Sequence, residues 1–336
     1  MDDISKGGIE LFSTCPPLGK SDGRSYLRRV IEVARWSEEA GCRGILIYTD
    51  NGQLDPWLVA QVVLDQTERL CPLVAVQPIY MHPHSIAKMV SSLGYLYGRR
   101  LYLNMVAGGF KNDLAALNDH AAHDQRYGRL IEYTRIIQAL LAGDGPVSLD
   151  GSYYKVDKLK LAPPLRAELR PGIFISGSSP AGRAAAEALH ATAINYPEPL
   201  HESAALPVLG VANGVRIGIL SRPDESAAWA AARARFPEDR TGQLTRQLAT
   251  RVSDSLWHKQ LSDLEAGVGR EPYWLVPFQQ YQTNCPYLVG DYARVGKELA
   301  GYIAIGYRTF ILDVPANVEE LSHIRKAFEH AALEMA

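Results

Sequence analysis

The chain has 336 residues and carries 35 Lys and Arg against 37 Asp and Glu, so its formal net charge is −2 at pH 7. This near balance disfavours a dedicated nucleic-acid binder, which normally carries a basic surplus, and no apolar run approaches the roughly 18 residues of a membrane span. The first residues lack the pattern of a secretory signal, and the four cysteines form no CxxC pair. We therefore expect a cytoplasmic globular protein that partners neither membrane nor nucleic acid, in a reducing compartment.

Along most of the chain, short apolar, β-branched segments alternate with longer segments of helical periodicity, a pattern typical of βαβ units around a parallel sheet. The predicted strands are residues 9–14, 44–48, 73–78, 101–106, 172–176, 191–196, 215–220 and 309–314. The predicted helices are residues 25–40, 56–68, 85–97, 126–141, 180–190, 224–236, 291–305 and 318–335. Eight strands with eight helices predict a (β/α)8 TIM barrel that forms a single domain over residues 1–336.

Residues 237–290 break this alternation and form an insertion between the seventh and eighth strands. The segment contains a polar helical stretch at 241–265, then Gly267 and Gly269, and then an aromatic run that includes Tyr273, Trp274 and Tyr281. A segment after a barrel strand lies at the C-terminal face, where active sites are found, so a mobile lid is one interpretation. A subdomain without a catalytic role, or an oligomer contact, is the alternative.

The most specific local feature is the apolar strand that runs into Gly177-Ser178-Ser179, with a helix starting at Pro180. A helix N-terminus offers free backbone N–H groups and a positive dipole, and two adjacent hydroxyls would complete a cradle for a phosphate. Arg183 and Ala184 replace the Lys and Ser/Thr of a P-loop, so a single terminal phosphate fits better than a nucleoside triphosphate. The alternative is that Ser179 only caps the helix.

A second feature lies at the end of the fourth predicted strand, Leu103-Asn104-Met105-Val106-Ala107-Gly108-Gly109. The paired glycines permit close approach of a ligand to the backbone. Asn104 is polar within an apolar strand, and its amide can both donate to and accept from a planar heterocycle. A core asparagine satisfied by its neighbours is the other interpretation.

Several histidines and one cysteine also fall near predicted strand ends. His120 and His123 would share one face of a helix, but no further ligand is spaced to complete a metal site, so no metal is expected. His82 and His84 follow the third strand, where contact with a substrate is favoured over metal binding. Cys15 ends the first strand without an evident basic partner, which favours a small buried side chain over a nucleophile.

Together these features resemble the bacterial luciferase-like flavin monooxygenases, most closely the alkanesulfonate monooxygenase branch. The resemblance covers nearly the whole chain, and the order and spacing of five motifs support it. They are Trp57-Leu58-Val59-Ala60, Leu103 to Gly109, His123-Asp124-Gln125-Arg126-Tyr127, Gly177-Ser178-Ser179 and Leu288-Val289-Gly290-Asp291.

The resemblance implies a barrel that binds flavin mononucleotide (FMN) at its C-terminal face. Ser178 and Ser179 would hold the phosphate, with His123 and Tyr127 closing around it. The ribityl chain and the ring would lie along three further matched residues, Asn104, Ala107 and Gly108. The family usually receives FMNH2 from a separate NAD(P)H-dependent flavin reductase and uses O2 as co-substrate, and its barrels commonly form homodimers or homotetramers.

The expected catalytic residues are His82 or His84, which would orient substrate or flavin, and Arg216, which would pair with an anionic group. The chain departs from the alkanesulfonate branch at Gln53, Gly218, Tyr281 and Val314. A sulfonate needs a cluster of donors, so the departures predict a less charged, small organic substrate. An F420-dependent oxidoreductase and a non-catalytic flavin-binding protein are the alternatives.

Overall fold

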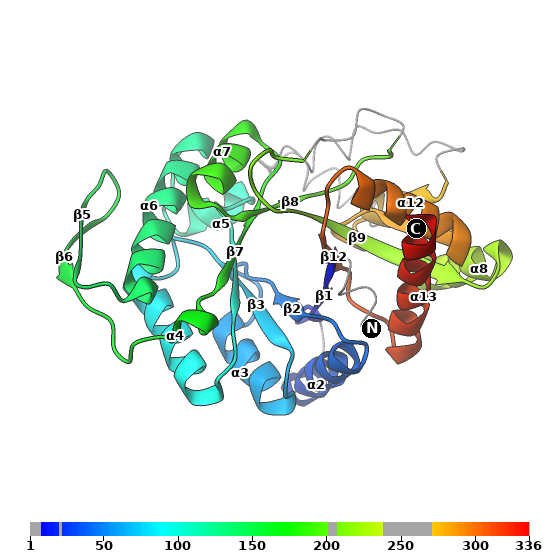
Figure 1. The fold of residues 1–336 in the computed structure, drawn as a ribbon, viewed down its shortest axis with the longest axis horizontal. Helices are drawn as coiled ribbons and strands as arrows, with labels where there is room; N and C mark the ends of the chain where they lie inside the picture. The colour runs from blue at the N-terminus through cyan, green and yellow to red at the C-terminus, as the bar shows by residue number, and fades with distance from the viewer. Residues whose placement is uncertain (1–7, 20–21, 201–206, 238–270, 336) are drawn as a thin grey trace.

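Eight parallel strands close into a barrel in the computed structural model, which describes residues 8–19, 22–200, 207–237 and 271–335 (Figure 1). Each strand pairs with the next, and the last pairs with the first. In barrel order they are β1 (Glu10–Thr14), β2 (Gly44–Ile47), β3 (Cys71–Val76), β4 (Tyr102–Met105), β7 (Gly172–Ser176), β8 (Thr192–Asn195), β9 (Asn213–Arg222) and β12 (Thr309–Leu312). The predicted (β/α)8 TIM barrel is confirmed.

Helices surround the barrel as an outer ring (Figure 1). The main ones are α2 (Gly23–Glu39), α3 (Pro56–Gln66), α4 (Pro83–Tyr97), α6 (His123–Ala142), α7 (Pro180–Leu189), α8 (Glu225–Arg235), α12 (Tyr292–Ala304) and α13 (Val318–Glu334). Short helices α5 (Lys111–Ala116) and α11 (Val276–Gln279) and a 3-10 turn at Ala167–Leu169 lie in the connections. Among the described helices, none is long and apolar enough to cross a bilayer.

Local sequence explains where the helices begin. The Asp55 side chain accepts a hydrogen bond from the Trp57 N–H, and Pro56 occupies the first helical position of α3, which needs no N–H donor. The helix α2 begins at Gly23 rather than 25. Two further predicted starts were also too late, because α4 begins at Pro83 rather than 85 and α6 begins at His123 rather than 126. Both corrections move histidines into the first turn of a helix or into its cap.

Alternating side chains fill the interior of the barrel, as the two-residue period of a strand requires. The Phe12 ring meets the rings of Tyr102 and Phe174 edge to face, with centroids 5.1 and 5.3 Å apart. Leu46, Leu73, Ile194 and Ile311 complete this buried layer. Beyond it, toward the C-terminal ends of the strands, the inward positions become polar, and a site can form there.

Strand β9 is longer than predicted and leaves the barrel. Its first residues pair with β8, while Gly218 to Arg222 pair with β11 (Tyr287–Asp291), which in turn pairs with β10 (Tyr273–Trp274). The segment 288–291, expected only to precede a helix, is therefore itself a strand. A second unpredicted feature is the hairpin of β5 (Val147–Asp150) and β6 (Lys155–Leu159), which projects beside α6 (Figure 1).

Candidate functional site

A cavity of about 460 Å³ opens at the C-terminal ends of the barrel strands. This volume falls within the range of small-molecule and cofactor sites. Its lining includes residues at or just beyond the ends of most barrel strands: Tyr48, Gln77, Asn104, Ser176, Tyr196, Arg216 and Asp313. A second cavity of about 480 Å³ adjoins it and shares the lining residues Thr49, Asp50, Gln53, Ala75 and Gln77.

One end of the main cavity is the turn between β7 and α7. Ser179 caps α7, and its hydroxyl oxygen accepts a hydrogen bond from the Gly182 N–H at 3.1 Å. The Ser178 hydroxyl is buried and has no hydrogen-bond partner among the described residues. A buried donor without a partner is costly, and a phosphate at this helix N-terminus would satisfy it.

Tyr127, in the first turns of α6, packs directly over this turn. A Cβ atom at Gly177 would lie 2.3 Å from the Tyr127 hydroxyl oxygen, so the close approach requires glycine. Burial raises the pKa of the Tyr127 phenol, and its hydrogen bond with Ser179 partly offsets that rise. The phenol therefore stays neutral and can act as a hydrogen-bond donor beside an anion.

His123 completes this end of the cavity. It is the first residue of α6, and its ring centroid lies 5.2 Å from that of Tyr127. Its Nδ1 lies 2.7 Å from a carboxylate oxygen of Asp124, which orients the ring. The four residues predicted to surround a phosphate, His123, Tyr127, Ser178 and Ser179, all line the cavity.

The end of β4 forms the adjacent wall. Asn104 is buried, and its Oδ1 accepts a hydrogen bond from the Ser176 hydroxyl at 2.7 Å. Its amide NH2 has no partner among the described residues, so it is available to a ligand. Gly108 adopts a φ of +99°, and a Cβ there would lie 2.9 Å from Leu114. With Ala107, these residues form a surface that a planar ring can approach closely.

Charged side chains reach the cavity from β9 and from the end of β12. Arg216 of β9 is buried, and its guanidinium carbon lies 5.2 Å from the centre of the Tyr48 ring. Burial alone would lower the pKa of Arg216, but Tyr196 and the other nearby acidic groups raise it above its ordinary value. Asp313, just beyond β12, accepts hydrogen bonds at one carboxylate oxygen from Tyr287 at 2.6 Å and Thr283 at 2.8 Å.

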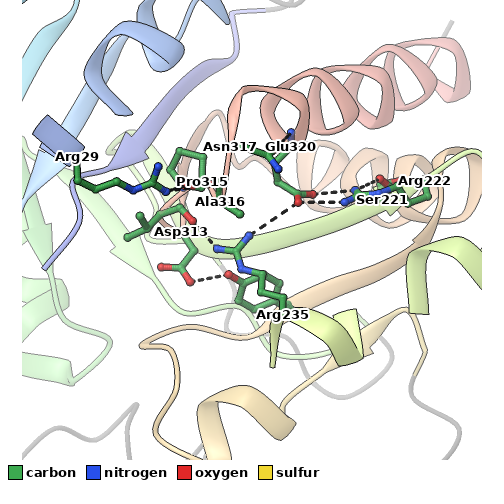
Figure 2. Close-up of polar contacts among 11 residues, drawn as sticks. Arg29, Ser221, Arg222, Arg235, Asp313, Pro315, Ala316, Asn317 and Glu320 are labelled. Carbon is green, nitrogen blue, oxygen red and sulfur yellow. Dashed lines mark hydrogen bonds and ion pairs between the residues drawn. The ribbon is translucent and has the colours of Figure 1, made fainter. Parts of the chain in front are cut away.

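A buried ionic network holds the loop that carries Asp313 (Figure 2). Glu320 of α13 accepts two hydrogen bonds from Arg222, at 2.9 and 3.1 Å, and lies 4.0 Å from Arg235. Arg235 also donates to the carbonyl of Val314. Arg29 of α2 donates to the carbonyls of Pro315 and Ala316. These contacts fix residues 313–317 between β9, α8, α2 and α13.

His82 and His84 do not line the main cavity. His82 caps α4 through its Nδ1, 3.2 Å from the His84 N–H, and its ring packs against Tyr154. The His84 Nε2 lies 3.3 Å from the carbonyl of Lys160. Both histidines therefore have their partners on the side of the β5–β6 hairpin. The proposed function assigns them no catalytic role.

The remaining predictions concern metal binding, Cys15 and the lid. His120 lies in the loop before α6, so it does not share a helix face with His123, and the described residues contain no cluster of three or more metal-ligating side chains.

Burial raises the pKa of the Cys15 thiol to about 12, so it is not a nucleophile at neutral pH. The predicted lid lies mostly at 238–270, including Gly267 and Gly269, outside the described residues.

The described aromatic residues after that segment have different environments. Tyr273 is buried and donates its hydroxyl to the carbonyl of Pro197 at 2.8 Å. Trp274 packs edge to face against Trp229 and Phe236. Only Tyr281 of these three lines the cavity, with a left-handed φ of 59°.

Sequence reasoning missed Tyr48, Gln77, Tyr196 and Asp313. The signal available was their position, because each follows or ends an apolar strand on the C-terminal side of the barrel. Thr283 and Tyr287, which orient Asp313, come from a segment whose strand was not recognised. Their contact depends on long-range pairing that local periodicity does not reveal.

Fold and site together define a (β/α)8-barrel protein whose C-terminal cavity can accept a planar ligand with a terminal phosphate. Comparison with known proteins identifies the family: residues 10–309 match the model described as luciferase-like monooxygenase, and the chain belongs to that family. It is 31% identical over 335 residues, 97% of this chain and 98% of the other, to "4-(gamma-L-glutamylamino)butanoyl-[BtrI acyl-carrier protein] monooxygenase BtrO" of Niallia circulans.

Solved structures show the same fold. Long-chain alkane monooxygenase (LadA) superposes with a TM-score of 0.73 at 14% identity, covering 97% of this chain and 91% of that one. EDTA monooxygenase (EmoA) from Chelativorans sp. BNC1 gives 0.70 at 14% identity, covering 98% and 95%. An F420-dependent secondary alcohol dehydrogenase gives 0.64 at 17% identity, covering 95% and 97%.

The comparisons confirm the prediction of a flavin-dependent monooxygenase, an oxidoreductase. The alkanesulfonate branch stays a prediction. The departure at Gly218 has a structural basis, because a Cβ there would lie 2.3 Å from the Tyr287 ring. That ring fills the space a larger side chain would need.

Proposed function

We propose that the protein is the oxygenase component of a two-component system that binds FMN as FMNH2 and uses O2 to hydroxylate an organic acyl substrate. The observation that carries this proposal is the buried, unpartnered Ser178 hydroxyl at the N-terminus of α7, beside the neutral Tyr127 phenol. Ser178, Ser179, Tyr127 and His123 would hold the phosphate. Asn104, Ala107 and Gly108 would contact the rest of the cofactor.

Reduced flavin, when bound, supplies the electrons that activate O2. In the net reaction one oxygen atom enters the substrate as a hydroxyl group, the other leaves as water, and the flavin is oxidised. The chain's own residues bind and orient the reactants. The Asn104 amide, fixed by Ser176, positions a ring, and the apolar layer beneath it, including Leu46 and Ile311, excludes water from the base of the cavity.

We propose as substrate class an acyl group attached to a carrier protein. The name of the Niallia circulans relative gives that kind of substrate, and the relative aligns over nearly the whole chain. The second cavity supports the proposal because it adjoins the first and offers a path past the apolar side chains of Leu54, Trp57 and Met81. An extended arm could lie there while its acyl end reaches the main cavity.

The partners we propose are an NAD(P)H-dependent flavin reductase and a second copy of the chain. Large exposed apolar side chains occur on α3 and α4, namely Leu58, Met89, Tyr95 and Leu96, and such patches favour an interface. A homodimer through this face, which could pair further into a tetramer, is therefore expected. The four free, buried cysteines support a reducing cytoplasm as the location.

The test combines cofactor binding with isotope labelling. The protein is titrated anaerobically with FMNH2 and with reduced F420, and then supplied with a flavin reductase, 18O2 and the 4-(γ-L-glutamylamino)butanoyl carrier protein. We expect preferential FMNH2 binding and a product that gains one 18O atom. Ser178→Ala should weaken FMN binding about 10-fold or more, as the loss of a hydrogen bond to a charged group predicts. The exposed-serine variant Ser152→Ala should leave binding unchanged.

Two outcomes would redirect the proposal. Tighter binding of F420 and hydride transfer without oxygen incorporation would indicate the F420-dependent oxidoreductase. Tight FMN binding without labelled product from any carrier-bound acyl group would indicate a flavin-binding protein without turnover on this substrate class.

A further inference from the structure

The guanidinium group of Arg216 lines the main cavity, and some of its N–H groups have no hydrogen-bond partner in the part of the chain that the structure describes. The residue is 8% exposed, and its Nε and Nη2 are buried with no hydrogen-bond partner among the described residues. Its guanidinium lies over the Tyr48 ring, which fixes its position without accepting those two N–H groups. Burying unpaired donors on a charged group is costly. An anionic acceptor bound in the cavity would remove that cost, and a carboxylate matches the fork geometry of Arg.

Asp313 presents the opposite charge to the same cavity. The hydroxyl groups of Tyr287 and Thr283 both donate hydrogen bonds to its Oδ2. The other oxygen, Oδ1, has no hydrogen-bond partner among the described residues, and no described cation lies within ion-pair distance of the carboxylate. The carboxylate is therefore held firmly by one oxygen and open at the other.

Strand register sets the relative backbone positions of these two residues. Arg216 pairs with Ile311, and both point into the barrel, so Asp313 occupies the next inward position on the neighbouring strand. Two residues along a strand advance about 6.6 Å. The two side chains do not themselves form an ion pair, so a ligand can bind between them.

We propose that Arg216 and Asp313 bind the zwitterionic head group of an α-amino acid at the end of the substrate. The carboxylate of the head group pairs with Arg216, and its ammonium group donates to Oδ1 of Asp313. A ligand with only a carboxylate would leave Asp313 unpaired and be repelled by it, so the pair selects for both charges. This inference rests on the proposed function, because it names the substrate class of the same cavity.

The position of the pair leaves the proposed cofactor site free. The proposed phosphate-binding turn follows β7 and the Asn104 wall ends β4, whereas Arg216 and Asp313 belong to β9 and the end of β12, which β8 separates from β7. The acyl group in the name of the Niallia circulans relative agrees with the proposal. A γ-linked glutamyl group keeps its α-amino and α-carboxyl groups free, at the end remote from the carrier.

The test measures binding of three soluble ligands to the FMN-loaded protein by calorimetry. They are γ-L-glutamyl-4-aminobutanoic acid, its glutaryl analogue without the α-amino group, and its 4-aminobutanoyl analogue without the α-carboxylate. We expect each deletion to weaken binding about 10-fold or more. Arg216→Gln should abolish discrimination against the ligand without the α-carboxylate. Asp313→Asn, which can keep its contacts with Thr283 and Tyr287, should abolish discrimination against the ligand without the α-amino group.

Controls separate this inference from the proposed function. Ser178→Ala should weaken FMN binding but leave ligand discrimination intact, and Asp150→Asn, in an exposed hairpin pair, should change neither. Equal affinity for all three ligands, or no binding of any, would overturn the inference even if oxygenation is observed. A loss of FMN affinity in Arg216→Gln with unchanged ligand discrimination would overturn it by making Arg216 a flavin contact. Discrimination without oxygenation would instead contradict the proposed function.

Discussion

At the scale of single residues, the end of the cavity proposed to hold a phosphate depends on how closely α6 approaches the β7–α7 turn. Gly177 and Gly182 both lie against the Tyr127 hydroxyl, and an added Cβ at Gly182 would also lie 2.6 Å from the Gly177 carbonyl oxygen. No side chain can therefore come between the phenol and the backbone N–H groups. The close contact between Tyr127 and the two glycines makes the turn sensitive to substitution. It also leaves the backbone N–H groups of the turn accessible to a small anion.

Gly177→Ala tests this contact. We expect it to destabilise the protein by about 1–3 kcal/mol, the usual cost of overpacking, and to weaken FMN binding. Adding Tyr127→Phe removes the hydroxyl that the new methyl group meets, so the double variant should recover at least half of the lost stability. Urea unfolding of the four proteins in this cycle measures the coupling.

Gly109→Ala is the matched control, because nothing lies within 4 Å of a Cβ at that position. It should change stability by less than about 0.5 kcal/mol. Equal destabilisation by Gly177→Ala in the presence and in the absence of Tyr127→Phe would contradict the steric explanation.

At the scale of elements, the end of α2 is joined to the start of β3 by one carboxylate. Glu38 accepts hydrogen bonds from the backbone N–H groups of Glu68, Arg69 and Leu70. Burial alone would raise the pKa of Glu38, but these three donors together lower it below its ordinary value. The ionised carboxylate is thus part of the native connection between the two elements.

This shift predicts a pH dependence of stability. A carboxyl with a lowered folded-state pKa stabilises the fold above its unfolded pKa of about 4.3, and that contribution is lost as pH falls through the folded-state pKa. Glu38→Gln should cost about 1 kcal/mol at pH 7, a value kept small because the carboxylate is partly exposed. Its unfolding free energy should also fall less steeply than that of the wild type below a pH of about 4.3. Parallel acid profiles of the two proteins would contradict this role.

The ionic network around Glu320 is the second connection at this scale. Glu320→Ala removes the carboxylate that neutralises Arg222 and Arg235, and breaking a buried pair in this way costs about 3–5 kcal/mol. Chemical denaturation measures the loss. Asp150→Ala, which breaks the exposed pair with Lys155, should cost less than about 1 kcal/mol. A loss below about 1 kcal/mol in Glu320→Ala would show that the network does not hold the Asp313 loop.

The elements also show what the sequence could and could not predict. All eight barrel strands were predictable because each is a short apolar run, and the cap at Ser179 was predictable because Pro180 follows it. The roles of His82 and His84 were not, because the earlier start of α4 turns His82 into a cap. The environment of Asp313 was hidden because its hydrogen-bond donors come from around β11, which pairs with the part of β9 beyond the barrel.

At the scale of the whole molecule, the closed barrel brings two chemically different walls to one cavity. Neutral donors from β4, α6 and β7 and charged side chains from β9 and the end of β12 line the same cavity at the C-terminal face. Because each wall is carried by its own strands and loops, changes in one need not disturb the other. In this barrel the proposed cofactor site and the proposed substrate site therefore rest on different strands.

The outer face of α3 and α4 carries the last prediction, the homodimer. Leu58, Tyr95 and Leu96 are 66%, 73% and 69% exposed, which is unusual for large apolar side chains unless another surface covers them. Leu58→Lys combined with Leu96→Lys would place like charges on both copies and so should convert a dimer into monomers, as measured by light scattering after size-exclusion chromatography. Leu333→Lys, at an equally exposed position on α13, should leave the mass unchanged. FMN binding should persist in the monomeric variant, because no residue of the proposed cofactor site lies on this face. A wild-type protein that is a monomer would contradict the homodimer, and a dimer that survives the double substitution would place the interface elsewhere.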